Sequence, residues 1–294
     1  MKRITEGTYA WFNIAPALLA VFGIILFPLV YTFILSLHNM SLTVESMGDF
    51  VGLKNYADTL SDDNFWASFW RTAYYTLVSI GLEMVLGLMI ALLLNEKLRG
   101  IAFLRTVIIL PWAVPTIVNG AMWKWIYHPE YGALNALLTQ LHLIPEYRSW
   151  LSSPWLAMNM VILADVWKMT PLVVIFLLAA LQTTNKSVYE AANVDGAGAF
   201  RRLFMLTLPH LKPTILVLIV MRTLDKFKAF DIFYAITMGG PADGTKVLVY
   251  QAYIKAFNNM NFSQGATISF LIAAIIGMMT FIYVKVLRAG GEAA

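Results

Sequence analysis

The sequence predicts an all-α polytopic membrane protein with six transmembrane helices. Of the 294 residues, 59% are hydrophobic and only 13% are charged, and the mean hydropathy is +0.68. A soluble domain has about 25% charged residues, so the 21 basic and 17 acidic side chains could not cover a water-soluble globule of this size. These values exclude a soluble enzyme, a disordered chain and a collagen-like fibre.

Six apolar stretches are long enough to cross a membrane, since a bilayer core of about 30 Å needs a helix of about 20 mostly apolar residues. They are Phe12–Leu37, Thr72–Leu94, Ile101–Ile126, Leu156–Leu181, Pro213–Ile236 and Gln264–Val286. The first stretch follows Lys2 and Arg3, as in a signal peptide, but it is too long and lacks a cleavage motif before Ser36, so we expect a retained anchor. No outer loop is long enough for a separate domain, so residues 1–294 are expected to form a single transmembrane domain.

Proline residues are expected to interrupt two of these stretches. Pro111 and Pro115 lie in the third stretch and Pro171 lies in the fourth. Each removes one backbone hydrogen bond from a helix, which is frequent in transporters but also common in other membrane helices.

The distribution of Lys and Arg predicts that both termini lie in the cytoplasm. With this orientation, eleven basic residues fall in cytoplasmic segments: Lys2, Arg3, Lys97, Arg99, Arg105, Lys186, Arg201, Arg202, Lys212, Lys285 and Arg288. Five fall in outer segments: Lys54, Arg71, Arg148, Lys246 and Lys255. An excess of basic residues marks the cytoplasmic side of a membrane protein, so this orientation is favoured.

The sequence offers no cluster with recognisable catalytic or metal-binding spacing. Cysteine is absent, which excludes disulfides and thiolate chemistry, and four scattered histidines make a histidine metal centre improbable. No Gly-Lys pair exists, so the glycine-rich loop that binds nucleotide phosphates is missing. If ATP drives this protein, we expect another chain to bind it.

The segment from Gln182 to Lys212, between the fourth and fifth stretches, is the most informative part of the sequence. Ser187 and Glu190 have the spacing of a capping box, and the short helix that they predict would end at Gly196, which tolerates a left-handed backbone. Residues 200–204 predict a second amphipathic turn before Pro209. From the residues alone, this segment is either pressed against a cytoplasmic partner or rests on the lipid surface.

The spacing Glu190-Ala191-Ala192, Gly196, then Leu206-Thr207-Leu208-Pro209 resembles the EAA loop of binding-protein-dependent ABC importers, with leucine at 206 where isoleucine is usual. The string 189–197, which ends in Asp-Gly-Ala, is similar to the version found in carbohydrate importers. Four other segments, residues 52–56, 110–115, 132–135 and 239–241, also resemble the carbohydrate importers, so the resemblance covers nearly the whole chain. The Gly-Gly-Pro loop at 239–241 favours the first of the two sugar permeases.

The resemblance implies the permease fold of a type I importer, similar to the methionine importer, in a prokaryotic inner membrane. It implies a complex with a second permease, two copies of a cytoplasmic ATPase subunit that carry ATP and Mg, and an extracytoplasmic substrate-binding protein. No cofactor and no catalytic residue are expected on this chain, and no nucleic acid is expected as a partner. By position, the residues that couple to the ATPase are Glu190, Ala191, Ala192, Asp195 and Gly196.

Charged residues lie near the centres of the second, fourth and fifth stretches, and they allow an inference that does not depend on the family resemblance. They are Glu83, Asp165, Lys168, Arg222, Asp225, Lys226, Lys228 and Asp231. A charge that faces lipid at this depth costs at least about 2.5–3.5 kcal/mol, so these groups must face one another or a polar cavity. We therefore expect the fifth stretch to be the most enclosed helix. The first stretch, with no charge between Glu6 and Glu45, should face lipid.

Two interpretations of these charges remain open. They line a hydrated solute path, in which Trp112 and Trp167 stack against sugar rings, or they form ion pairs that fix helix packing. The expected pairs are Asp165–Lys168, Arg222–Asp225 and Lys228–Asp231.

The sequence thus favours a permease subunit of an ATP-driven importer for a carbohydrate or a carbohydrate-like solute. A polyamine or amino-acid permease of the same family is the nearest alternative. A proton-coupled secondary carrier would also use buried carboxylates such as Glu83 and Asp165, but the inverted repeats common in such carriers are not visible.

Overall fold

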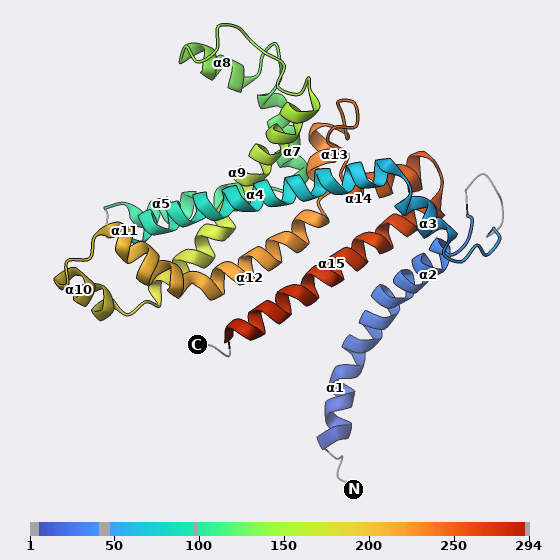
Figure 1. Cartoon of the computed structure of the whole chain (residues 1–294), viewed down its shortest axis with the longest axis horizontal. Coiled ribbons are helices and arrows are strands. Elements are labelled where there is room, and N and C mark those ends of the chain that lie inside the picture. The colour runs from blue at the N-terminus through green and yellow to red at the C-terminus, as the bar shows by residue number, and fades with distance from the viewer. Residues whose placement is uncertain (1–5, 41–47, 97–98, 292–294) are drawn as a thin grey trace. The chain divides into compact units, whose positions relative to one another are not determined.

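The computed structural model of the protein describes residues 6–40, 48–96 and 99–291. Within these ranges the regular structure is helical, apart from one isolated bridge between His38 and Phe50. The chain divides into two compact units, residues 1–66 with 251–273 and residues 67–250 with 274–294, which we describe separately. Figure 1 labels the helices.

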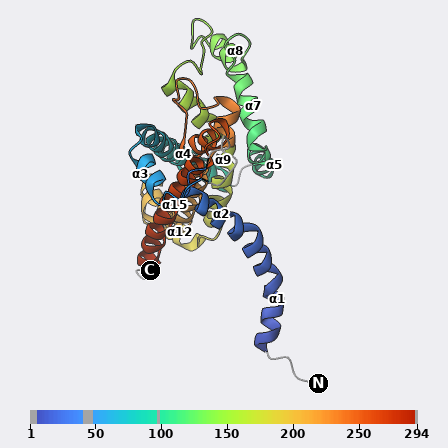
Figure 2. The ribbon, with the colours of Figure 1, turned by 90° about the vertical axis from the view of Figure 1, so that its right-hand side faces the viewer.

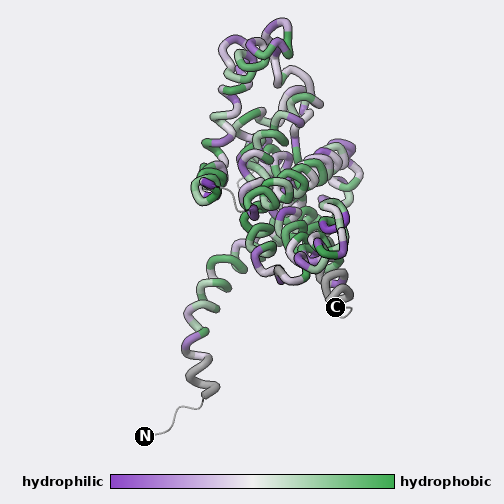
Figure 3. Tube along the Cα trace, turned by 90° about the vertical axis from the view of Figure 1, so that its left-hand side faces the viewer, coloured by the Kyte–Doolittle hydropathy of each residue, from purple (hydrophilic) through white to green (hydrophobic). Residues whose placement is uncertain are grey.

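The helices confirm the predicted all-helical membrane protein. Five continuous helices are long and apolar enough to span a membrane: Asn13–Ser36, Asp63–Asn95, Pro154–Gln182, Ala199–Phe227 and Phe262–Tyr283. A sixth span is formed if Ile101–Ala113 and Thr116–Ile126, which meet at 94°, count as one broken helix. The tube in Figure 3 is coloured mainly as hydrophobic along the helices.

The first unit holds the N-terminal span and its connection to the next helices. Its elements are α1 (Glu6–Ala20), the π-helix η1 (Val21–Leu26), α2 (Phe27–Ser36), α3 (Lys54–Leu60), the π-helix η3 (Ile254–Asn258) and the first parts of α4 (Asp63–Asn95) and α15 (Phe262–Gly291). Only 6% of the apolar window of Asn13–Ser36 is buried, as expected for an uncharged span. Asn55 Nδ2 donates to the carbonyls of Ser36 and His38 at 2.9 and 2.8 Å, and Tyr56 bonds Ser36 Oγ at 2.7 Å, so this loop is fixed to the end of α2.

The second unit is built around α9 (Pro154–Gln182). Its other elements are α5 (Ile101–Val107), α6 (Leu110–Ala113), α7 (Thr116–Ile126), α8 (Ala133–Gln140), α10 (Lys186–Val194), α11 (Ala199–Arg202), the π-helix η2 (Leu203–Thr207), α12 (Leu208–Phe227), α13 (Asp231–Ile236) and the start of α14 (Leu248–Tyr253), with the remainders of α4 and α15. The apolar window of α9 is 67% buried, against 17% for Ala199–Phe227.

The expectation that the fifth span is the most enclosed helix is therefore wrong. The charged residues that it contributes to the buried interior lie in the last two turns of α12, so burial is required only there, at residues such as Arg222 and Lys226. The rest of α12 buries one side, at Leu211 and Leu218, which pack into the apolar core formed with α4 and α9.

One span is broken in this unit, and its second half packs against the short helix α13. The chain is extended at Val114 (φ −71°, ψ 129°), and Pro115 then caps α7. This break follows from the predicted prolines, whereas Pro171 stays inside the continuous helix α9. The fifth span begins at Ala199 and ends at Phe227, so the expected helix Pro213–Ile236 is wrong at both ends, and α13 is separate.

The helices α7 and α13 approach so closely that a Cβ atom placed on Gly120 would lie 2.4 Å from the Cβ of Ala235. Glycine at position 120 therefore allows α7, the second half of the broken span, to touch α13. Figure 2 shows α7 between α5 and α8.

The segment after α9 forms the predicted short helix, with a different cap. Helix α10 begins at Lys186, and Asn185 Oδ1 accepts hydrogen bonds from Ser187 N at 3.0 Å and Ser187 Oγ at 2.8 Å. Asn185, rather than Ser187, is thus the N-cap. Gly196 adopts a left-handed backbone (φ 74°) at the helix end, as predicted.

Residues 199–212 continue directly into the fifth span. The chain stays helical from α11 through η2 into α12, so the turn predicted at 200–204 is the start of a longer helix. Pro209 lies in the first turn of α12, next to the wider π turn of η2, where its missing N–H is tolerated.

Candidate functional site

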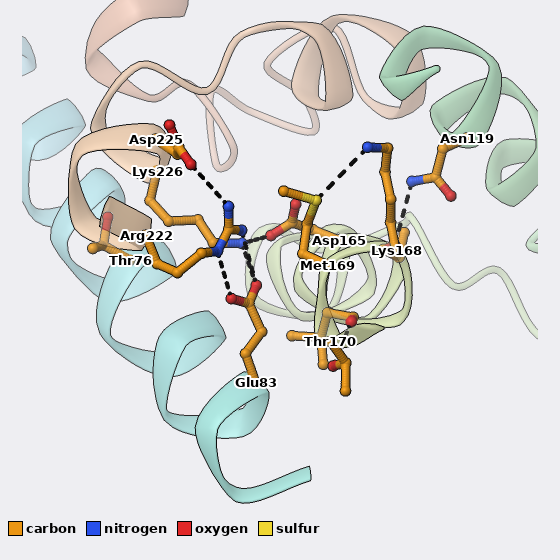
Figure 4. Close-up of polar contacts among 12 residues, drawn as sticks. Thr76, Glu83, Asn119, Asp165, Lys168, Met169, Thr170, Arg222, Asp225 and Lys226 are labelled. Carbon is orange, nitrogen blue, oxygen red and sulfur yellow. Dashed lines mark hydrogen bonds and ion pairs between the residues drawn. The ribbon is translucent and has the colours of Figure 1, made fainter. Parts of the chain in front are cut away.

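Three helices bring four charged side chains into one buried network. Arg222 of α12 bonds Glu83 of α4 through Nε at 2.9 Å and Nη2 at 3.2 Å. Lys226 Nζ lies 2.7 Å from Glu83 Oε1 and also pairs with Asp165 of α9. The four side chains, which are nearly excluded from solvent, converge in Figure 4. Two carboxylates face two cations, so the enclosed network (Glu83, Asp165, Arg222 and Lys226) is formally neutral.

Three further charges lie at the edge of this network. Asp225 accepts from Arg222 Nη1 at 3.1 Å, and its side chain is 47% exposed. Lys228 and Asp231, which follow the end of α12, are also exposed. We call these three residues the open edge. Their side chains are exposed on this chain, whereas the side chains of the enclosed network are buried.

The structure confirms one of the three predicted ion pairs, Arg222–Asp225. The pair Asp165–Lys168 is wrong, because Asp165 pairs across to Lys226 and Lys168 Nζ lies against Met169 Sδ at 3.7 Å. The pair Lys228–Asp231 is not found among the described residues. Spacing along one helix misses these contacts, because the stronger partners come from other helices.

A cavity of about 170 Å³ lies beside the network at the two helix breaks. Its lining includes Thr116, where α7 begins, and residues 228–232, between α12 and α13. Asp165, Lys168 and Arg222 also line it. Discontinuous helices with charged linings are typical of solute sites in membrane transporters.

The sequence missed three uncharged members of this region. Tyr75 and Thr116 line the cavity, and the Tyr75 ring lies 4.9 Å from Lys226 Nζ. Asn119 is fully buried, and its Nδ2 donates to Ala164 O at 3.3 Å. Trp112 and Trp167 are partly exposed and lie outside the cavity lining, with Trp167 packed edge-on against Trp123. Nothing in the sequence distinguishes Tyr75, Thr116 or Asn119 from other polar residues on membrane helices.

The short helix α10 presents Glu190 and Ala191 on an exposed surface. Two contacts hold α10 to the start of the fifth span: Tyr189 Oη bonds Thr207 Oγ1 at 2.7 Å, and Arg202 donates to Asn193 Oδ1. Asp195 and Gly196 are exposed in the turn that follows, and Val194 and Phe200 expose large apolar side chains. The segment is therefore anchored on one side and open on the other.

A helical membrane fold with one broken span, a buried charge network and a charged cavity is typical of a membrane transport protein. Residues 83–289 match the family model described as "Binding-protein-dependent transport system inner membrane component". The chain belongs to this family, which confirms the resemblance seen in its motifs.

Two relatives match almost the whole chain. The trehalose/maltose transport system permease protein MalF of Thermococcus litoralis is 39% identical over 286 residues, which cover 97% of this chain and 96% of the relative. The sulfoquinovosyl glycerol transport system permease protein SmoG of Agrobacterium fabrum is 34% identical over 278 residues, which cover 94% and 89%.

Solved structures confirm the fold. A chain of a bacterial ABC transporter that imports the acidic polysaccharide alginate superposes with a TM-score of 0.84 at 18% identity and covers 98% of both chains. A chain of the MetNI methionine ABC transporter superposes with a TM-score of 0.53 at 17% identity, covering 78% of this chain and 98% of that one. The predicted similarity to the methionine importer is thus confirmed at the level of the fold.

Membership of the family settles several expectations. The chain is a multi-pass inner-membrane transport subunit rather than an enzyme. It works with a binding protein, carries no cofactor, and leaves the binding of ATP to a separate ATPase subunit.

Proposed function

We propose that this permease carries a carbohydrate or carbohydrate-like solute into the cytoplasm and that α10 transmits the motions of the ATPase to the solute path. The relatives named above support the solute class, because their names specify trehalose, maltose and a sulfoquinovosyl glycoside. The observation that carries the coupling role is the exposed Glu190 on a short helix between two spans. A carboxylate in that place can accept charge-assisted hydrogen bonds from a partner chain.

The proposed complex holds this chain, a second permease, two copies of the ATPase subunit and an extracytoplasmic binding protein. Both termini lie in the cytoplasm, as the eleven inner basic residues favour. The coupling loop is residues 182–212, and Glu190, Ala191, Ala192, Asp195 and Gly196 form its contact surface. The small alanine side chains allow a partner to approach the backbone, and Gly196 permits the sharp turn.

The solute path is proposed to follow the open edge. Asp225, Lys228 and Asp231 are hydrated and border the cavity, so they can exchange hydrogen bonds with a polar solute. Lys168 and Trp167 of α9 add a cation and a partly exposed aromatic ring, and Trp112 of α6 adds a second ring. The enclosed network acts as a packing element, because its charges are already satisfied within the chain.

The test is ATP hydrolysis by the complete complex in proteoliposomes, with its binding protein and a panel of solutes. We expect disaccharides or glycosides to stimulate hydrolysis several-fold and to accumulate inside the vesicles. Stimulation by polyamines or amino acids alone would contradict the solute class. Uptake that needs a proton gradient and no ATP would contradict the importer.

The contact between Tyr189 and Thr207 provides a second prediction. It joins α10 to the helix that carries Arg222, which lies about 22 Å further along at 1.5 Å per residue. We expect Tyr189→Phe, which removes only the hydroxyl, to leave hydrolysis near the wild-type rate but to lower the solute moved per ATP about two- to tenfold, as for the loss of one hydrogen bond. The measurement is uptake and hydrolysis in the same vesicles.

A matched control for this change is Tyr131→Phe, in the exposed segment before α8. It should alter neither quantity. An unchanged ratio of uptake to hydrolysis in Tyr189→Phe would show that this contact does not transmit motion.

A further inference from the structure

A second groove, of about 300 Å³, lies in the second unit where α4, α5 and α9 end. Its walls are almost entirely apolar, with contributions from Leu94, Ile108, Ile109, Val174 and Leu178. It shares no lining residue with the charged cavity. Its two polar members are Arg105 and Gln182.

Arg105 is the unusual member of this groove. Its Nη2 donates to Leu94 O at 2.7 Å, at the end of α4, but its Nε is buried and has no hydrogen-bond partner. Among the described residues, no carboxylate forms an ion pair with it. A guanidinium has five N–H donors, and a buried charge is stable only when it is paired. Among the described residues the groove therefore offers a half-buried cation with no carboxylate partner, which an anion from outside this chain can complete.

The shape and polarity of the groove restrict that anion. A small hydrophilic ion would leave the apolar walls in contact with water, so the ligand must carry a long apolar part as well as a negative charge. In the orientation of the proposed function, this end of α4 and α9 faces the cytoplasm, where the anionic lipids of the bilayer concentrate. Arg99, exposed in the turn before α5, adds a second positive charge close by in the chain.

We propose that this groove binds an anionic phospholipid of the cytoplasmic leaflet. Its phosphate accepts hydrogen bonds from Arg105, and one acyl chain lies along Ile108, Ile109, Val174 and Leu178. Basic pockets between membrane helices on the cytoplasmic side are typical sites for such head groups. The bound lipid would join α5 to the end of α9 and would add to the link that Arg105 already makes with the end of α4 through Leu94 O.

The test is native mass spectrometry of the complete transporter, stripped of lipid in detergent and titrated with phosphatidylglycerol or phosphatidylcholine of the same chain length. We expect phosphatidylglycerol to bind, and Arg105→Gln to weaken it about tenfold, the effect of one charge-assisted hydrogen bond. Ala179→Trp keeps Arg105 but fills the groove beside Leu178, and it should weaken binding to a similar extent. Arg148→Gln, at an exposed arginine of the outer loop, is the matched control and should leave binding unchanged.

Four results would overturn the proposal. These are equal binding of both lipids, unchanged binding in Arg105→Gln, unchanged binding in Ala179→Trp, and displacement of the lipid by inorganic phosphate alone. A carboxylate of another subunit that crosslinks to position 105 would assign the groove to a protein contact instead. Because lipid binding is read without transport, its failure leaves the proposed importer function standing, and a failure of transport leaves the lipid result standing.

Discussion

Replacing Arg222 with methionine is expected to lower the free energy of unfolding by about 3–5 kcal/mol, because breaking a buried ion network leaves its remaining charges uncompensated. Glu83, which is fully buried, would keep only Lys226, and that cation is shared with Asp165. The measurement is thermal unfolding of the purified complex in detergent, together with the yield of folded protein. We expect a large fall in both.

Two variants make this prediction specific. Lys228→Met removes a cation from the open edge, so it should change stability by no more than about 0.5 kcal/mol while it reduces uptake. The double variant Glu83→Leu with Arg222→Met leaves the neutral pair Lys226–Asp165 and should recover much of the lost stability. A double variant as unstable as the sum of the two single variants would show that the four charges do not act as one network.

Replacing Glu190 with alanine is expected to abolish most ATP-driven uptake, because it removes the exposed carboxylate through which α10 would bond the ATPase. Membrane insertion should be unchanged, since Glu190 lies outside the spans. The measurements are copurification of the ATPase subunit, uptake by vesicles, and the amount of permease in the membrane.

The control for this variant is Glu146→Ala, which removes an exposed carboxylate from the segment between α8 and α9. It should leave assembly with the ATPase intact. Full uptake by Glu190→Ala vesicles that lack any ATPase subunit would contradict the importer, and full uptake with the ATPase present would contradict the role of Glu190.

The sequence predicted those parts of the fold that depend on one helix or one residue type. The lengths of the apolar stretches predicted where the spans lie, and Pro115 predicted the break before α7. The end of the helix at Phe227 was not predicted, because neither proline nor glycine lies between Phe227 and Asp231. There the helix ends where Arg222 and Lys226 are held by other helices, a tertiary effect that a local pattern cannot reveal.

The candidate site shows the same division. The cost of placing a charge in lipid predicted that Glu83, Asp165 and Arg222 would meet, and they do. Which cation pairs with which carboxylate depends on the geometry between helices, so the pairs proposed from i,i+3 spacing were mostly wrong. The predicted N-cap of α10 was wrong because Asn and Ser are both favourable N-cap residues. Only the backbone conformation decides between Asn185 and Ser187.

The exact cancellation of charge inside the enclosed network has an evolutionary consequence. Since Glu83, Asp165, Arg222 and Lys226 satisfy one another, substitutions at Lys228 or Asp231 leave no unpaired charge in the interior. Solute preference can therefore change through substitutions at the open edge while the enclosed network and the helix packing stay the same. One ancestral scaffold could in this way give rise to carriers of chemically different solutes.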